Sequence, residues 1–184
     1  AAGADQQLIS PGDTPELLAG VGTAYLEIFE ALPDLAAVVV PVGSGTGAAA
    51  AALVAEKLAP GCRVIAVQSA AAPAAHDSWR LGEIVRRPSR TAVDGLATGR
   101  GYTLPQRLMR TGVADFRLVS DAQIAAAQRL LASHAHTLAE GAGAAALAAV
   151  LARPDEFAGQ HVAVVCTGGN ASAAEIAAMG AAAA

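Results

Sequence analysis

The chain is short of the residues that usually supply bulk or cross-links. Aromatic residues make up 3% of its 184 residues, and it has two cysteines, Cys62 and Cys166. Two cysteines cannot form a disulfide framework or a zinc site. Because both lie in or beside apolar runs, we expect buried, inert thiols. The core must be built from aliphatic side chains, and alanine is the commonest residue.

Positive charge and long apolar runs are also scarce. The chain carries 12 Lys and Arg against 16 Asp and Glu, a net charge of −4, and this balance disfavours nucleic-acid binding. No run reaches the roughly 18 uninterrupted apolar residues of a membrane span. The N-terminus shows no basic stretch followed by an apolar one, as a signal peptide would. We therefore expect a cytoplasmic protein with neither nucleic-acid nor membrane partners.

What the chain does have is a folded-domain composition, with 54% hydrophobic and 15% charged residues. Four runs rich in Val and Ile are predicted strands: Ala36–Val42, Arg63–Gln68, Phe116–Ser120 and His161–Thr167. Seven helices are predicted: Pro15–Ala31, Gly47–Leu58, Ala72–Leu81, Thr103–Thr111, Asp121–Ala135, Glu140–Ala152 and Ala171–Ala183. Strands that are apolar on both faces and alternate with helices predict an α/β fold, a three-layer αβα lobe with a mostly parallel sheet over residues 1–184. Residues 83–101, rich in Arg, Gly and Thr, are predicted to be irregular.

A glycine-rich turn follows the first predicted strand, in the order Gly43-Ser44-Gly45-Thr46-Gly47, and leads into a helix. Glycines let the backbone approach a ligand closely, and N–H groups at a helix N-terminus favour an anion. No Gly-Lys-Ser/Thr follows, so this is not a P-loop, and the third glycine falls one position early for a dinucleotide fingerprint. The turn predicts a phosphate site to which Ser44 and Thr46 add hydroxyl donors. The alternative is a tight strand–helix turn without a ligand.

The chain resembles the serine/threonine dehydratases among the fold-type II pyridoxal-phosphate (PLP) enzymes, specifically the C-terminal part of their catalytic domain. The glycine turn looks like the loop that holds the cofactor phosphate in that family. Further similar segments follow in family order: Pro15–Glu30, Val67–Ala74, Ser78-Trp79-Arg80, Val93–Ala97, Leu118–Asp121, Ala139–Leu147 and Thr167-Gly168-Gly169-Asn170. The likeness covers nearly the whole chain.

The resemblance implies roles for seven cofactor-binding residues: Gly43, Ser44, Gly45, Thr46, Gly95, Glu140 and Thr167. The first four would cradle the phosphate of pyridoxal 5'-phosphate. Gly95 would contact the cofactor near its ring, and Thr167 would hydrogen-bond the pyridine nitrogen. Glu140 would place a carboxylate near the cofactor, or else be an ordinary glutamate at a helix start.

The chain departs from the family in lacking the lysine that forms the cofactor Schiff base. Its one lysine, Lys57, falls late in the helix after the glycine turn, where we expect a solvated side chain. The family's substrate-carboxylate loop is absent too. Some relatives bind a divalent cation after the second strand, but the matching positions here are Gln68 and Ala74, and Asp77 is isolated. We therefore expect no metal.

The implied activity is that of a PLP-dependent ammonia-lyase, which converts a β-hydroxy amino acid into a 2-oxo acid and ammonia. Three explanations for the missing lysine stay open: a fragment of a full dehydratase, one half of a split enzyme, or a non-catalytic lobe that binds a phosphate or nucleotide. Under all three we expect this chain alone to be inactive. The partners implied are a small amino-acid substrate, the N-terminal lobe and, from the family, a second copy in a homodimer.

Other polar residues give weaker signals. His134 and His136 point to different helix faces, and His76 is expected at the surface. The cluster of Arg86, Arg87 and Arg90 is expected to be a solvated loop.

Overall fold

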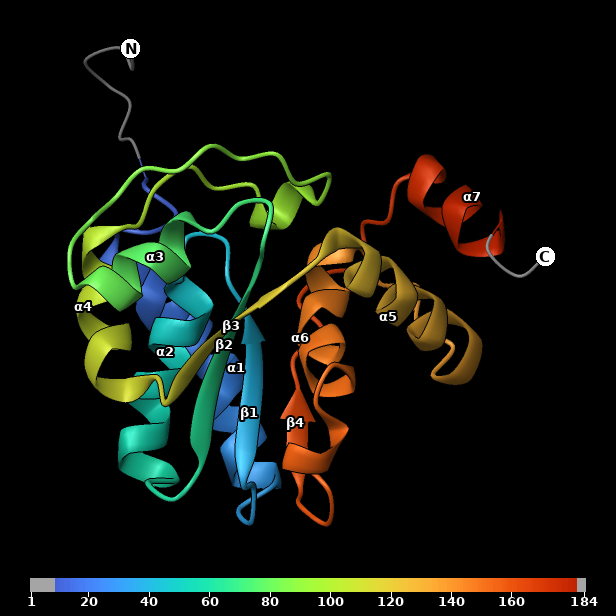
Figure 1. Ribbon diagram of the computed structural model, residues 1–184. Helices are drawn as coiled ribbons and strands as arrows, with labels where there is room; N and C mark the ends of the chain where they lie inside the picture. Colours follow the sequence, from blue (N-terminus) through green and yellow to red (C-terminus); the bar gives the residue numbers. More distant parts are fainter. Residues whose placement is uncertain (1–8, 182–184) are drawn as a thin grey trace.

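The computed structural model describes residues 9–181 as a four-stranded sheet between two layers of helices (Figure 1). The strands are β1 (Ala37–Pro41), β2 (Arg63–Ser69), β3 (Asp115–Val119) and β4 (Val162–Val164). They are all parallel and lie in the order β3-β2-β1-β4. The predicted three-layer α/β fold is therefore confirmed.

β1 is the buried centre of the sheet. It pairs with β2 from Ala37 opposite Arg63 to Pro41 opposite Val67, and with β4 over three residues. Side chains alternate across a strand, so Val38 faces one helical layer and Val39 the other. Both are fully buried, and each contributes about 1.5–3 kcal/mol through burial.

One layer holds α1 (Pro15–Ala31), α2 (Thr46–Leu58), α3 (Ala74–Leu81) and α4 (Thr103–Gly112). The buried face of α2 is almost entirely alanine, from Ala48 to Ala52. Such small side chains let α1 approach closely, and its large residues Leu18, Tyr25 and Phe29 fill the space. These few larger groups compensate for the scarcity of aromatic residues.

The other layer holds α5 (Asp121–His134) and α6 (Gly141–Leu151). α5 starts with a capping box, in which the Ser120 hydroxyl accepts the Gln123 N–H and the Gln123 side chain accepts the Ser120 N–H. α6 is built from Ala and Gly on its buried face, so it lies close against β1 and β2. The last helix, α7 (Ala173–Ala181), lies beyond α5 (Figure 1).

The predicted bounds of α3 and β4 differ from the structure. α3 begins at Ala74 rather than Ala72, because Ala72 closes a turn by donating its N–H to the Ser69 carbonyl. β4 is shorter than predicted, because after Val164 the chain leaves the ladder to cross the start of α6. Cys166 lies on this crossing and is exposed, so the expectation of two buried thiols is wrong, although Cys62 is buried.

The predicted starts of the last two helices also differ from the structure. α6 begins at Gly141, one residue after the predicted Glu140, and α7 begins at Ala173 rather than Ala171. The predicted end of this last helix, at residues 182–183, lies outside the described residues.

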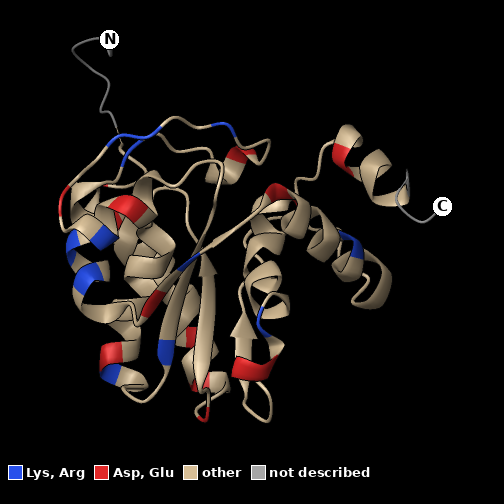
Figure 2. Cartoon of the chain, viewed as in Figure 1, with Lys and Arg blue, Asp and Glu red and all other residues tan. Residues whose placement is uncertain are grey.

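Residues 83–101 are irregular, as predicted, with only a 3-10 turn at Asp94–Leu96 and an isolated bridge between Arg86 and Arg100. Asp121 anchors the segment by accepting hydrogen bonds from the Thr91 hydroxyl and the Ala92 N–H. Figure 2 shows basic residues along this segment and the adjacent α3 and α4. Arg86 and Arg90 are exposed as expected, whereas Arg87 pairs with an aspartate of α3.

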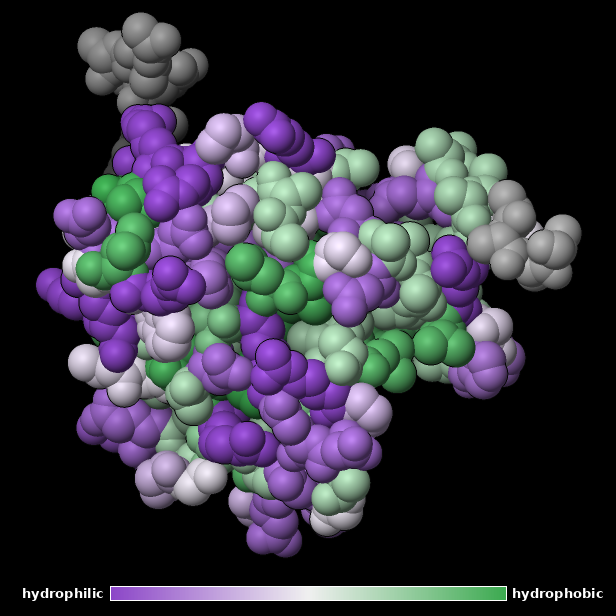
Figure 3. Space-filling view, viewed as in Figure 1, coloured by the Kyte–Doolittle hydropathy of each residue, from purple (hydrophilic) through white to green (hydrophobic). Residues whose placement is uncertain are grey.

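The surface of the described residues is mixed. In the view of Figure 3, apolar atoms gather over α5 and α6, and hydrophilic atoms predominate on the side of α3 and α4. Within residues 9–181, no helix combines the length and apolar character that crossing a bilayer requires.

Candidate functional site

The glycine turn lies at the carboxyl end of β1, where the order of the sheet reverses. β2 and β3 are added on one side of β1 and β4 on the other. In parallel sheets this reversal leaves a crevice beyond the strand ends, and such crevices bind ligands. Residues 43–46 flank the crevice from β1, and the connection after β4 flanks it from the other side.

The backbone of the turn suits its residues. Gly45 is the residue that precedes α2 and has a φ of 96°, in the left-handed region that favours glycine. Ser44 and Thr46 avoid positive φ, so their side chains introduce no backbone strain. Gly43 is required for a different reason: an added Cβ would fall well inside 3.0 Å of the Gly95 carbonyl oxygen.

The N–H groups of the turn point to an anion. Within the described part of the chain, the backbone N–H groups of residues 43–47 have no acceptor. Gly45 and Thr46 are buried, and buried N–H groups are costly unless something pairs with them. A phosphate at the N-terminus of α2 would satisfy these donors and would also interact favourably with the helix dipole. The residues present therefore fit a phosphate-bearing group.

The hydroxyls of the turn make hydrogen bonds within the chain. Ser44 Oγ and Thr46 Oγ1 both donate to the carbonyl of Pro11, and they lie 3.0 Å from each other. The segment before α1 thus crosses the turn and occupies these side chains. Among the described residues, the donors of the turn that lack an acceptor are therefore backbone N–H groups.

Gly95 and Glu140 lie close to the turn. The Gly95 carbonyl lies against Gly43, and an added Cβ on Gly95 would lie 2.6 Å from Ala142 Cβ and 3.9 Å from Glu140 Oε1. Gly95 is therefore held between the turn and the start of α6, and no side chain fits there.

Glu140 directs its carboxylate toward the crevice. It is the residue before α6, yet its side chain does not cap that helix. Instead, Glu175 of α7 accepts the Gly141 N–H at 3.0 Å. The Glu140 carboxylate lies against Gly168, and among the described residues it has no hydrogen-bond partner. The N–H of Gly141 at the start of α6 is thus capped by Glu175 and not by Glu140.

Thr167 lies on the connection that follows β4. Its side chain is exposed. The next residue, Gly168, accepts the Glu140 N–H through its carbonyl at 3.1 Å, and Gly143 lets this carbonyl lie close to α6. Thr167, Glu140 and the glycine turn therefore lie at the same end of the sheet.

Two residues near the turn were not predicted to have a role. Gln68, at the end of β2, is fully buried and donates from Nε2 to Thr98 Oγ1 at 3.2 Å. Thr98 in turn donates to the Gly43 carbonyl at 3.0 Å. The sequence does carry a signal for Gln68, because it is a polar residue at the end of an apolar strand. Thr98 has no comparable signal, because it lies in an irregular segment.

Other predicted candidates lie elsewhere. Lys57 lies in the last turn of α2, is 71% exposed and pairs with Glu56, so it is far along the helix from the glycine turn. The expectation of a surface His76 is wrong: its side chain is only 14% exposed, because its ring packs edge-on against Phe116 at 5.4 Å.

The carboxylate beside His76 belongs to an ion-pair network. Burial acts to raise the pKa of Asp77, but hydrogen bonds from His76 and Arg87 outweigh it and lower that pKa. Within residues 9–181, no cluster of three or more His, Cys, Asp or Glu side chains is arranged to hold a metal ion. The Asp77 carboxylate is engaged by His76 and Arg87.

Comparison with known proteins agrees with this geometry. The family model described as "Pyridoxal-phosphate dependent enzyme" matches residues 3–168, so the chain belongs to this family. It is 38% identical over 164 residues to L-threonine ammonia-lyase of Geobacter sulfurreducens, covering 88% of this chain and 40% of that protein. It is 34% identical to beta-hydroxyaspartate dehydratase of Paracoccus denitrificans, covering 88% of this chain and 51% of that protein.

Solved structures show the same fold. Serine racemase of Dictyostelium discoideum superimposes with a TM-score of 0.84 at 30% identity, over 90% of this chain and 54% of that one. A fungal L-serine ammonia-lyase from Rhizomucor miehei gives 0.83 at 26% identity, over 93% and 58% of the two chains. The chain thus spans about half the length of the relatives it matches, and the resemblance to fold-type II PLP enzymes is confirmed.

Proposed function

We propose that this chain forms the phosphate-binding lobe of a PLP-dependent ammonia-lyase that deaminates a β-hydroxy amino acid. The observation that carries the proposal is the set of backbone N–H groups in residues 43–47 that find no acceptor within residues 9–181. They lie at the N-terminus of α2, and two of them belong to buried residues. The relatives named above act on threonine, serine or hydroxyaspartate according to their names, which supports a hydroxy amino acid as the substrate class.

The chain's own groups would bind and orient the cofactor. The N–H groups of Gly43, Ser44, Gly45 and Thr46 would hold its phosphate. Thr167 would place a neutral hydroxyl at the ring nitrogen, which leaves that nitrogen largely unprotonated and favours elimination over transamination. When bound, the cofactor supplies the electron sink that lets the substrate lose its α-proton and its β-hydroxyl.

Gly95 and Glu140 would line the ring side of the same site. Gly95 offers backbone contact without a side chain, because α6 leaves no space for one. The unpartnered Glu140 carboxylate would be an acceptor for a group on the cofactor or substrate, since an isolated carboxylate at a site edge accepts hydrogen bonds strongly. Its position on the first residue before α6 is stabilised by the helix dipole.

The anchoring lysine would come from an N-terminal lobe, on the same or a separate chain. Lys57 cannot fill this role, because it lies at the far end of α2 from the turn. By this reasoning, the chain alone binds the cofactor without forming product. We also propose that the complete enzyme works in the cytoplasm and forms a homodimer, as the family resemblance implies.

The test is a reconstitution. The chain is mixed with the lysine-bearing N-terminal half of a relative, and 2-oxo acid is measured from threonine, serine and 3-hydroxyaspartate. We expect product only from the mixture, and none when the anchoring lysine of the added half is replaced by alanine. Binding of PLP and of pyridoxal, which lacks the phosphate, is measured on the chain alone. Equal binding of the two would refute the phosphate cradle, and tight PLP binding without product in the mixture would favour a non-catalytic binding lobe.

A further inference from the structure

The Thr98 side chain, from the irregular segment 83–101, hydrogen-bonds to the glycine turn. Thr98 Oγ1 donates to the Gly43 carbonyl at 3.0 Å, although the two residues are far apart in the sequence. The Gly95 carbonyl of the same segment also lies close to Gly43. The turn is therefore supported by residues 95–98, outside both β1 and α2.

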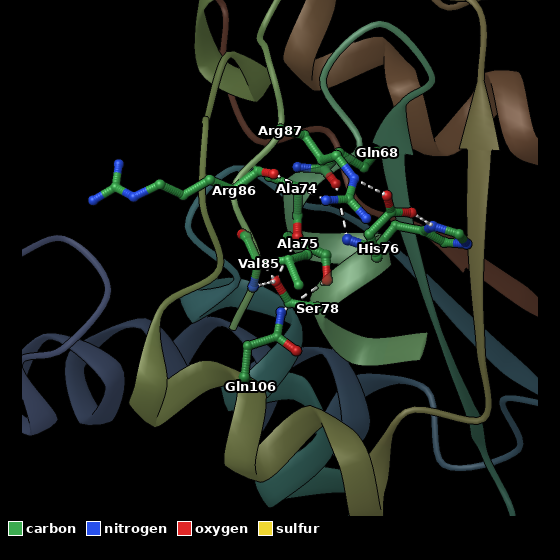
Figure 4. A network of polar contacts seen from close by, with 10 residues as sticks. Gln68, Ala74, Ala75, His76, Ser78, Val85, Arg86, Arg87 and Gln106 are labelled. Carbon is green, nitrogen blue, oxygen red and sulfur yellow. Dashed lines mark hydrogen bonds and ion pairs between the residues drawn. The ribbon is translucent and has the colours of Figure 1, made fainter. Parts of the chain in front are cut away.

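The direction of this hydrogen bond is set by a buried amide. The His76 N–H lies in the first turn of α3, where helix N–H groups lack partners within the helix. It donates to Gln68 Oε1 at 3.0 Å (Figure 4). This fixes the amide so that Nε2 faces Thr98, to which it donates at 3.2 Å. Thr98 Oγ1 accepts that bond, so its single proton is available for Gly43.

Holding the Gly43 carbonyl also aims the next N–H. The peptide unit between Gly43 and Ser44 is trans and planar, so its C=O and N–H point in opposite directions. With the carbonyl held by Thr98, the Ser44 N–H points away from residues 95–98. That N–H is one of the unpaired donors of the proposed cradle.

We infer that Gln68 and Thr98 are positioning residues, which orient the Ser44 N–H toward the phosphate through the Gly43 carbonyl. The inference rests on the proposed function, because it takes the turn as the phosphate site. Gln68 is fully buried, and both the oxygen and the nitrogen of its side-chain amide are hydrogen-bonded. We call the series of hydrogen bonds from His76 through Gln68 and Thr98 to Gly43 the relay. The relay therefore joins the starts of α2 and α3 through one threonine hydroxyl.

The test compares three variants of Thr98 in the full chain. Thr98→Val removes the hydroxyl and keeps the shape, Thr98→Ala removes it with less bulk, and Thr98→Ser restores it. Loss of one neutral hydrogen bond predicts that Thr98→Val weakens PLP binding about fivefold. Thr98→Ser stays within about twofold of the parent chain, and pyridoxal binding is unchanged in all three. Thr23→Val is the matched control, because the Thr23 hydroxyl also donates to a backbone carbonyl, within α1.

A second readout does not depend on cofactor binding. The amide resonance of Ser44, recorded without ligand, should shift in Thr98→Val and Thr98→Ala and return toward the parent position in Thr98→Ser. An unmoved Ser44 amide in a folded Thr98→Val or Thr98→Ala chain would overturn the inference. So would PLP binding equal to that of the parent chain. If the parent chain binds PLP no better than pyridoxal, the proposed function fails, while the Ser44 amide still decides whether the relay orients the turn.

Discussion

Replacing Gly45 by alanine tests whether the glycine turn needs the conformation it has. At a φ of 96°, a residue with a Cβ costs about 1–2 kcal/mol relative to glycine. The new Cβ would also lie 2.9 Å from Met109 Cε and 3.0 Å from Pro105 Cβ. Met109 is flexible and can yield, whereas the proline ring cannot, so crowding adds about 1 kcal/mol. Alanine also has fewer conformations than glycine in the unfolded chain, so it loses less entropy on folding, which offsets the destabilisation by about 0.4–1 kcal/mol. The net expectation is a loss of about 1–2.6 kcal/mol in the free energy of unfolding.

The assay is chemical unfolding together with PLP binding. Gly159→Ala is the matched control, because its φ is 72° but no atom lies within 4 Å of the added Cβ. It carries the backbone cost without the crowding, and the difference between the two variants isolates the packing effect. We expect Gly45→Ala to weaken PLP binding at least tenfold, since charge-assisted hydrogen bonds are lost, and Gly159→Ala to leave it unchanged. Destabilisation no greater than that of Gly61→Ala, which has neither positive φ nor neighbours, would refute the reasoning.

Three further predictions follow from groups outside the turn. Burial acts to raise the pKa of Asp121, but hydrogen bonds from a serine hydroxyl, a backbone N–H and a threonine hydroxyl outweigh it and lower that pKa. The stabilisation of the fold by ionised Asp121 is therefore present above the pKa of an unfolded aspartate, about 4, and is lost as pH falls through the lower pKa of the folded chain. Asp121→Asn removes this titration, so the free energy of unfolding should fall less steeply at acid pH. An unchanged pH dependence would contradict this. Glu175→Ala should destabilise the chain by about 1 kcal/mol, because it uncaps α6, whereas Glu16→Ala, at an exposed site in α1, should change stability by less than half of that. Cys166 should react with a thiol reagent in the folded chain and Cys62 only after unfolding, since Cys62 is buried and burial raises the pKa of its thiol; equal rates would show that the crossing after β4 is not exposed.

The sequence predicts well those elements whose signals are local. α1 begins and ends as predicted, because Pro15 marks its first turn and an amphipathic pattern continues to Ala31. β1 and β2 are recognisable as apolar runs, because strands covered on both faces are apolar along their length, and the polar residues of β2 stand at its ends. The end of β4 is not predictable from the sequence, because β1 continues to Pro41 and the pairing ends where the chain turns to cross α6.

The same distinction holds for the site. The glycine turn is predicted from consecutive residues, and its position before α2 is confirmed. The hydrogen bond between Gln68 and Thr98 is not predictable, because Thr98 lies in an irregular segment that no periodicity describes, beyond the whole of α3. The contacts of the Ser44 and Thr46 hydroxyls are not predictable for a related reason: their acceptor, Pro11, lies far upstream in the sequence.

The short strand β4 has a consequence for handling the chain. It pairs with β1 along one edge, and among the described residues nothing pairs with its other edge. Its side chains are only half buried. An open edge with half-buried valines is a template for another extended segment, including one from a neighbouring molecule. The chain on its own should therefore self-associate as its concentration rises, and light scattering should show this association decreasing once a cognate N-terminal lobe is added.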